Sequence, residues 1–312
     1  MKKLIALLMV LMLSTIIAMP VPAGQPPCLQ MQTEQAGNTV AEVMEIIMTR
    51  YAGGPVTVDE LLEAAIRGMM QTLDCYSVYL CREELESFTS SLSGQMPCQG
   101  NASSDYSPGK ATVSVNCLSE METCGMNLEN FRHIKIDLIG LSTGEEIREA
   151  LAVMADEDVT GIILDLRNNA GGFLDVTMDI AGQLVPGGVV FRTVSKTGRR
   201  VTHSSFLQEV PFENIVVLVN GRTASAAEVI AAALQDSGAA VVIGEHTYGK
   251  GTVQSIYKIR TGGALKLTTE EFFRRNGDTI NVYGVTPCII VENECTNLDY
   301  VLLRGVRELA GR

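Results

Sequence analysis

Residues 215–254 decide the fold of this chain, because they combine two buried-type strands, a helix start and a glycine-rich loop. The run Ile215-Val-Val-Leu-Val219 is wholly apolar and predicts a buried strand. The segment Asn220-Gly-Arg-Thr-Ala-Ser-Ala-Ala-Glu228 turns the chain and opens an alanine-rich run, which predicts a helix. Val241-Val-Ile243 predicts a second short strand. One serine therefore stands where a strand turns into a helix.

That serine, Ser225, is the candidate nucleophile. A residue at a helix start lies beside backbone N–H groups that have no partner inside the helix, and such groups can hydrogen-bond an oxyanion. The positive end of the helix dipole adds to this effect. The alternative is an ordinary N-cap serine, whose hydroxyl only satisfies the helix end.

Lys250 is the candidate base. It lies between Gly249 and Gly251, directly after the second strand. Flanking glycines allow a close approach of backbone and ligand. A lysine that loses solvation in such a loop has a lower pKa and can accept a proton. The alternative is an ordinary solvated lysine.

The same loop resembles a phosphate-binding P-loop only superficially. Gly244-x-x-x-x-Gly249-Lys250 lacks the Ser or Thr that must follow the lysine, since Gly251 stands there. A P-loop also leads into a helix. Residues 252–259 instead alternate and are β-branched, which predicts a strand. The sequence therefore argues against nucleotide binding.

Three blocks together resemble the signature segments of the C-terminal processing peptidases, the tail-specific serine proteases of family S41. They are Leu164-Asp-Leu-Arg-Asn-Asn-Ala-Gly-Gly172, the Asn220–Glu228 segment and Gly244-Glu-His-Thr-Tyr-Gly-Lys-Gly-Thr-Val-Gln254. They occur in the family's order and spacing, and the resemblance covers 39–92 and 131–293. Ala170 replaces the proline that usually precedes the two glycines, and this loosens the loop.

The resemblance implies a catalytic set. Ser225 would be the nucleophile, Lys250 the base, and Gln254 a third member that orients the lysine, while the backbone N–H groups of Gly171 and Ala226 would form the oxyanion hole. Because an extended strand would hold residues 250 and 254 about 13 Å apart, the loop must bend for their side chains to meet. A Ser–His–Asp alternative would use His246 and Asp236.

Alternating strand and helix patterns from residue 131 onward predict an α/β fold with a parallel βαβ core. Strands are expected over 133–139, 161–167, 252–259 and 264–269, and helices over 39–51, 58–73, 82–88, 143–154, 175–184 and 298–309. The resemblance implies a crotonase-like, ClpP-like core, which follows an N-terminal helical region and precedes a β-rich C-terminal part.

Composition limits the partners. The formal net charge of −12 argues against binding to nucleic acid or to anionic membranes. Residues 1–23 have a basic start, an apolar run and small residues, as secretory signals do, so we expect a protein that is secreted or held in the cell envelope, and tethered to the membrane if the signal stays uncleaved. The Met-rich helices are expected to serve the core.

The eight cysteines indicate disulfides rather than a metal site. None forms Cys-x-x-Cys and only three histidines occur, so neither zinc nor another cofactor is expected. An even count in an exported chain favours disulfide bonds. By proximity the candidate pairs are Cys75–Cys81, Cys117–Cys124 and Cys288–Cys295, with free thiols as the alternative.

The expected organisation is a signal peptide (1–23), a linker and helical region (24–92, with the linker over 24–37), a short cysteine-containing insert (93–130) and the peptidase core (131–312). The insert stands where family members carry a PDZ domain that captures the substrate's C-terminus, and it is too short for one. Regulation therefore differs, and a separate activator or adaptor is one candidate.

The functional expectation is a serine endopeptidase that acts on protein or peptide substrates near their C-termini. The competing class is a catalytically silent peptide-binding or scaffold protein with the same fold. A crotonase-type acyl-CoA enzyme is disfavoured by the export signal and the Ser/Lys pair. A homodimer is left open. Cleavage assays on the parent and on Ser225→Ala would separate the classes.

Overall fold

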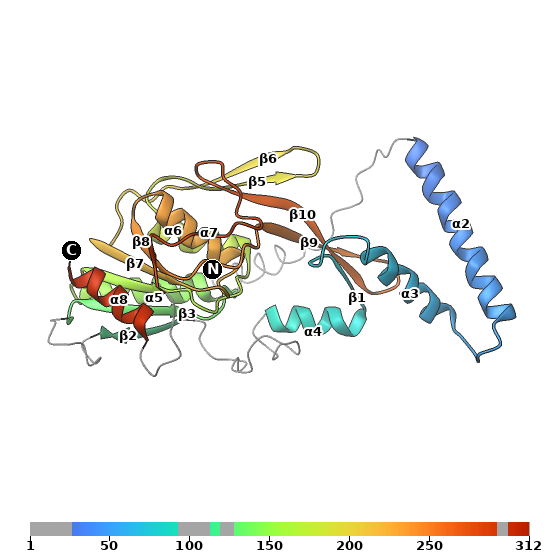
Figure 1. The fold of residues 1–312 in the computed structure, drawn as a ribbon, viewed down its shortest axis with the longest axis horizontal. Coiled ribbons are helices and arrows are strands. Elements are labelled where there is room, and N and C mark those ends of the chain that lie inside the picture. The colour runs from blue at the N-terminus through green and yellow to red at the C-terminus, as the bar shows by residue number, and fades with distance from the viewer. Residues whose placement is uncertain (1–26, 93–112, 119–127, 292–298, 312) are drawn as a thin grey trace, which may run out of the picture. The chain divides into compact units, whose positions relative to one another are not determined.

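The computed structural model describes residues 27–92, 113–118, 128–291 and 299–311. The chain forms two compact units, coloured by residue number in Figure 1. Unit 1 comprises the residues up to Glu86 together with Gln254–Thr268, and unit 2 comprises Ser87–Val253 together with Thr269–Arg312.

Within the described residues, unit 1 contains two whole helices, the first residues of a third, the strand β1 (Val78–Leu80), most of β9 (Thr252–Lys258) and the first part of β10 (Ala264–Arg274). The helix α2 (Pro27–Arg50) begins earlier than predicted, so the expected linker over 24–37 is wrong from residue 27 onward. Proline suits the first helical position, and the residues after it include Leu, Gln, Met and Glu, which form helices well. Their polarity and the proline indicated a linker.

The second helix, α3 (Val58–Met70), matches the predicted helix closely. Its start is fixed by a capping box, in which Thr57 and Glu60 each accept a hydrogen bond from the other's backbone N–H. After α3 the chain forms β1, which pairs with β10 so that Tyr79 lies opposite Leu265. α4 (Arg82–Leu92) follows.

Unit 2 is built on a six-stranded sheet with the strand order β11-β8-β7-β4-β3-β2. All pairs are parallel except β2 with β3, which confirms the predicted α/β core with its parallel sheet. In chain order the strands are β2 (Val113–Cys117), β3 (Phe131–Ile136), β4 (Gly161–Asp165), β7 (Asn214–Val219), β8 (Ala240–Gly244) and β11 (Ile289–Ile290).

Helices cover both faces of this sheet, so the central strands β4 and β7 are apolar except at one end of each. The four helices are α5 (Thr143–Asp156), α6 (Leu174–Leu184), α7 (Ala226–Asp236) and α8 (Tyr300–Ala310). Alternate strand residues divide between two cores: Ile162 and Leu164 belong to the core with α5, α6 and α7, whereas Ile163 packs in the core with α8. These parallel strands carry the candidate site at their carboxyl ends.

A second sheet contains the hairpin of β5 (Gly188–Ser195) and β6 (Arg200–Ser205). Neither of these two strands is predicted from the sequence. In unit 2, β5 pairs with the latter part of β10 (Ala264–Arg274), which is longer than predicted. β9 (Thr252–Lys258) also pairs with β10 and is a strand as predicted, so no helix follows the glycine-rich loop. The P-loop reading is thereby excluded.

A buried ion-pair network stands where β4 ends. Asp165 accepts hydrogen bonds from the guanidinium and backbone N–H of Arg167, and His133 Nε2 lies 3.1 Å from its Oδ2. Arg167 also bonds both carboxylate oxygens of Asp299, which caps α8. This network ties the end of β4 to the start of α8.

The cysteine prediction is partly overturned. Cys75 and Cys81 are free thiols, so the pair predicted between them is wrong. The extended strand β1 lies between the two positions and keeps them apart. Cys288 is also a free thiol, so the predicted Cys288–Cys295 pair is wrong as well. The Cys117–Cys124 pair stays a prediction, because Cys124 lies outside the described residues. Among the described helices, none is long and apolar enough to cross a membrane.

Asp165 makes acid stability testable. Burial alone would raise the pKa of Asp165, but hydrogen bonds from Arg167 and His133 outweigh it and lower that pKa to about 2. Because its pKa is lowered on folding, the carboxylate stabilises the fold above its unfolded-state pKa of about 3.9, and this stabilisation is lost as pH falls toward 2. Between pH 5 and pH 3 the parent should lose about 1 kcal/mol through this group.

The measurement is urea unfolding of the parent and of Asp165→Asn at both pH values. The variant will be less stable at every pH, since the largely buried Arg167 keeps Asp299 but loses one of its two carboxylate partners. Its loss of stability between pH 5 and pH 3 should nevertheless be smaller than the parent's. The matched control is Asp137→Asn, which removes a surface carboxylate. Equal losses in the parent and in Asp165→Asn would contradict the assignment.

Candidate active site

Ser225 has a strained backbone at the start of α7. Its φ is 56° and its ψ is −120°, a conformation that non-glycine residues rarely adopt. β7 ends at Val219, the turn that begins at Asn220 leads to Ser225, and α7 begins at Ala226. An ordinary N-cap has extended backbone geometry, so Ser225 is not an ordinary cap. Strain of this kind gathers at functional sites, where the surrounding structure holds it.

The carboxylate of Glu228 holds that conformation. Glu228 is completely buried, and its Oε2 accepts hydrogen bonds from the backbone N–H of Ser225 (2.8 Å) and of Lys250 (2.9 Å). Its Oε1 accepts from the Thr247 hydroxyl (2.5 Å) and from the Gly249 N–H (2.7 Å). One oxygen atom thus joins the backbones of the predicted nucleophile and the predicted base.

Sequence reasoning missed the role of Glu228. It lies three residues after Ser225, which is the spacing of a capping box, and this was the available signal. The pattern does not show that the same carboxylate also binds a loop more than twenty residues later. Glu228 is a positioning residue, because it bonds the backbones of Ser225 and Lys250 rather than any reacting atom.

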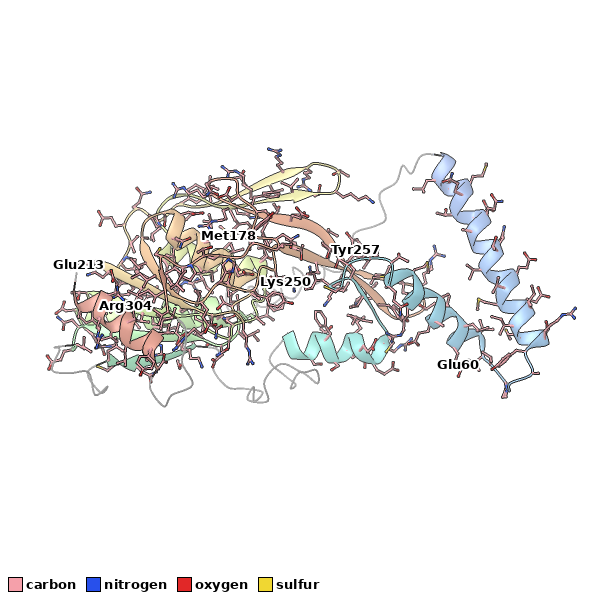
Figure 2. The ribbon with its side chains drawn as sticks, viewed as in Figure 1. Glu60, Met178, Glu213, Lys250, Tyr257 and Arg304 are labelled. Carbon is pink, nitrogen blue, oxygen red and sulfur yellow. The ribbon has the colours of Figure 1, made fainter. Side chains whose placement is uncertain are left out.

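Thr247 extends this network toward the C-terminal part of unit 2. Its hydroxyl donates to Glu228 and accepts the N–H of Val285 (2.7 Å). The next residue, Tyr248, donates its N–H to the carbonyl of Thr223 (3.0 Å), just before Ser225. The half-buried Lys250 follows in the loop before β9 (Figure 2). The loop is therefore held on both sides.

The predicted oxyanion-hole residues lie together. Gly171 has φ +96°, and a Cβ added to it would lie 2.9 Å from both the Ala226 nitrogen and the Ser225 Cβ. Only glycine allows this approach. However, the Gly171 N–H donates to Oδ1 of the buried Asn169 (2.8 Å). Asn169 also donates to the Ile136 carbonyl, and its own carbonyl accepts the N–H of Ala224.

A pair of asparagines aligns the two loops that bear these groups. Asn168, at φ 64°, donates its N–H to Oδ1 of Asn220, and the Asn220 side chain donates to Oδ1 of Asn168, each at 3.0 Å. Asn168 precedes the Gly171 loop, and Asn220 begins the turn that leads to Ser225. These two hydrogen bonds fix the spacing of the two loops, although Ala170 stands where the family usually has a proline.

Gln254 belongs to unit 1, whereas Ser225, Lys250, Gly171 and Ala226 all belong to unit 2. Within unit 1, the Gln254 Nε2 donates to the Thr268 hydroxyl (3.4 Å).

A further hydrogen-bond network surrounds Thr268 in unit 1. Thr268 donates its hydroxyl to Asp74 and its N–H to the Ser77 hydroxyl. Burial by itself raises the pKa of Asp74, but hydrogen bonds that its carboxylate accepts from Tyr76, Thr268 and Ser77 lower this pKa on balance. The role of Gln254 toward Lys250 stays a prediction.

The alternative Ser–His–Asp set is not assembled. Asp236 ends α7, about 16 Å along the helix axis from Ser225, and it forms an ion pair with Arg274. His246 places its Nδ1 3.0 Å from the Thr247 carbonyl. These separate engagements do not form the chain of hydrogen bonds that a triad requires.

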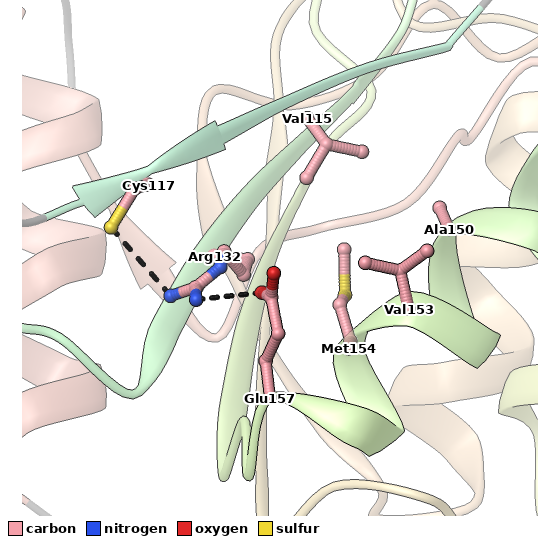
Figure 3. Close-up of a pocket in the computed structure, with 7 residues that line it drawn as sticks. All are labelled: Val115, Cys117, Arg132, Ala150, Val153, Met154 and Glu157. Atoms are coloured by element: carbon pink, nitrogen blue, oxygen red, sulfur yellow. Dashed lines mark hydrogen bonds and ion pairs between the residues drawn. The ribbon is translucent and has the colours of Figure 1, made fainter.

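A cavity of about 300 Å³ lies apart from these residues, between β2, β3 and α5 (Figure 3). Arg132 crosses it, near the Cys117 sulfur (3.6 Å) and paired with Glu157 (2.8 Å). None of the predicted site residues lines it. Across the described ranges, no group of three or more His, Cys, Asp or Glu side chains is placed to hold a metal.

Comparison with known proteins identifies the class that this fold and this arrangement define. Residues 126–291, more than half of the chain, match peptidase family S41. The chain belongs to this family, which is the serine peptidase family that the three sequence blocks indicate.

Relatives agree with this assignment. A carboxyl-terminal-processing protease of Synechocystis sp. is 33% identical over 160 residues, which cover 51% of this chain and 38% of the relative. A carboxy-terminal processing protease of Bacillus subtilis is 26% identical over 300 residues, covering 75% and 64%. The solved photosystem II D1 C-terminal processing protease is 28% identical with a TM-score of 0.54, covering 65% and 53%. The chain thus spans about two fifths of the length of the Synechocystis relative.

The carboxylate of Glu228 provides a test of the site. Glu228→Gln should lower the free energy of unfolding by about 3 kcal/mol, because the amide NH₂ meets buried N–H donors. Thr247→Val should weaken the same network by removing a donor to Glu228 and the acceptor of Val285, whereas Thr247→Ser keeps both. Urea unfolding measures all three. Parental stability in Glu228→Gln, or equal losses in the two Thr247 variants, would contradict the role assigned to this network.

Proposed function

We propose that this protein is a serine endopeptidase in which Ser225 is the nucleophile and Lys250 the general base. The observation that carries the proposal is the shared acceptor: one buried carboxylate oxygen of Glu228 binds the backbone N–H of both residues. The strained backbone of Ser225 at a helix start supports the same roles, because it lifts the hydroxyl toward the helix N-terminus.

The proposed reaction has two stages. The Ser225 hydroxyl attacks the scissile carbonyl while neutral Lys250 takes its proton, and the lysine then passes that proton to the leaving amine. Water next attacks the acyl-serine, and Lys250 again accepts a proton and returns it to Ser225. Gln254 is proposed to orient Lys250, from its position four residues further along the chain.

The oxyanion is proposed to bind the N–H groups of Ala226 and Gly171. Ala226 begins α7, so its N–H stands at the positive end of the helix. Gly171 would have to exchange Oδ1 of Asn169 for the oxyanion, since these two are hydrogen-bonded. Each such donor contributes roughly 3 kcal/mol to the transition state. This exchange of hydrogen-bond acceptors requires only a change within the loop that holds both Asn169 and Gly171.

The substrate class is proposed from the names of the relatives, and the location from the composition of residues 1–23. The relatives' names describe processing of carboxyl termini, so we propose protein or peptide substrates cut near that end. We propose that the segment 93–130 replaces a PDZ domain, and that a separate activator takes over its control. Residues 1–23 have the composition of an export signal, so we place the protein outside the cytosol. N-terminal sequencing of the mature protein would test this export.

The decisive experiment compares cleavage of denatured casein by the purified parent, by Ser225→Ala and by Lys250→Ala. We expect cleavage by the parent and a loss of at least 1,000-fold in each variant, because both groups act in the same step. Gln254→Ala should retain part of the activity, since an orienting residue is less critical.

The controls separate the alternatives. His246→Ala should keep activity, because the site does not use that ring as its base. Activity that survives in Lys250→Ala would sink the proposed base. If the parent neither cleaves casein nor reacts at Ser225 with a serine-directed fluorophosphonate probe, the protein belongs to the binding class instead.

A further inference from the structure

Two loops beside Lys250 expose large apolar side chains. Tyr248 is 57% exposed, Val282 80% and Tyr283 68%. Isolated apolar residues on a surface are ordinary, but a group of them next to a candidate active site is a sign of a binding surface. All three belong to unit 2, as do Ser225 and Lys250.

The two loops lie against each other. The N–H of Val282 donates to the carbonyl of Gly249 (2.8 Å). A Cβ added to Gly249 would lie 2.9 Å from the Val282 carbonyl carbon and oxygen. The same loop is tied to the turn before Ser225 by the Tyr248–Thr223 backbone bond. The three exposed side chains therefore belong to backbone that directly adjoins the proposed base.

Val282 carries strain that the fold does not explain. Its φ is 72°, which is unfavourable for a β-branched residue. Gly284, two residues later, has φ 58° with no such penalty. Because the Val282 side chain is mostly in solvent, it contributes little packing that would offset the strain. A strained, exposed apolar residue at this place points to contact with a ligand.

We infer that Tyr248, Val282 and Tyr283, the apolar rim, bind an apolar side chain of the substrate polypeptide next to the scissile bond. This inference rests on the proposed peptidase function and adds a preference to it. Aromatic side chains offer large contact areas with little loss of conformational freedom, and Val282 adds an aliphatic surface beside them. The rim would favour substrates with an apolar residue at one fixed position from the cut.

The test maps cleavage sites. The full chain, Val282→Asn and Tyr283→Ser each digest a denatured protein mixture, and mass spectrometry reads the cuts. Asn tolerates the left-handed backbone, so Val282→Asn removes the apolar surface and keeps the loop. We expect the parent to prefer apolar residues at one position. In the variants, kcat/KM for peptides with Leu there should fall about tenfold, while peptides with Ser there change less than twofold.

Val282→Gly separates binding from a structural role. Glycine relieves the strain, so the unfolding temperature should rise, while the preference for apolar residues should fall. If Val282 served a structural role instead, Val282→Gly would lower the unfolding temperature. The matched control is Val153→Gln, which removes an exposed apolar side chain from α5 and should leave the cleavage profile unchanged.

The outcomes are distinct. Cleavage that depends on Ser225, with the same profile in Val282→Asn, Tyr283→Ser and the parent, overturns the inference and leaves the peptidase proposal intact. A lower unfolding temperature in Val282→Gly also counts against it. Absence of any Ser225-dependent cleavage in the parent overturns the proposed function and this inference together.

Discussion

The site depends on one buried carboxylate. Glu228 has no exposure to solvent, and burying a charge is strongly unfavourable unless hydrogen bonds satisfy it. Four donors do so, three from backbone and one from a hydroxyl. Charge-assisted bonds are about twice as strong as neutral ones, so the network tolerates the strained backbone of Ser225. Helix α7, the Ser225 turn and the Lys250 loop consequently form one piece.

Much of the fold could be predicted because its central strands are buried on both faces. The run at Ile215 and the run at Ile162 are apolar without interruption, and such runs in an α/β pattern indicate a parallel sheet. The position of Ser225 at a helix start also followed from local sequence. The residues within each of these short segments determine the local structure, so the segments could be predicted without knowing which distant residues they contact.

The rest depended on contacts between distant residues. No strands were predicted over Gly188–Ser205. The polar β6 becomes a strand only through pairing with β5, whereas the Val- and Thr-rich β5 carries a local strand signal that the prediction missed. The three donors to Glu228 from the Lys250 loop could not be foreseen from spacing, since that loop is far from Glu228 in the sequence. Likewise, nothing in the local sequence shows that Val282 has a left-handed backbone.

Unit 1 is made of two separate stretches of chain, and this discontinuity governs how the protein can be dissected. Strand β10 begins in unit 1, where Ala264 lies opposite Leu80, and continues into unit 2, where Arg274 lies opposite Phe191. No single break in the polypeptide yields either unit whole. A fragment that began after Glu86 would keep β9 and β10 but leave the first part of β10 without β1. Limited proteolysis or truncation therefore cannot separate the two units at one point in the sequence. The two units have to be produced as one polypeptide.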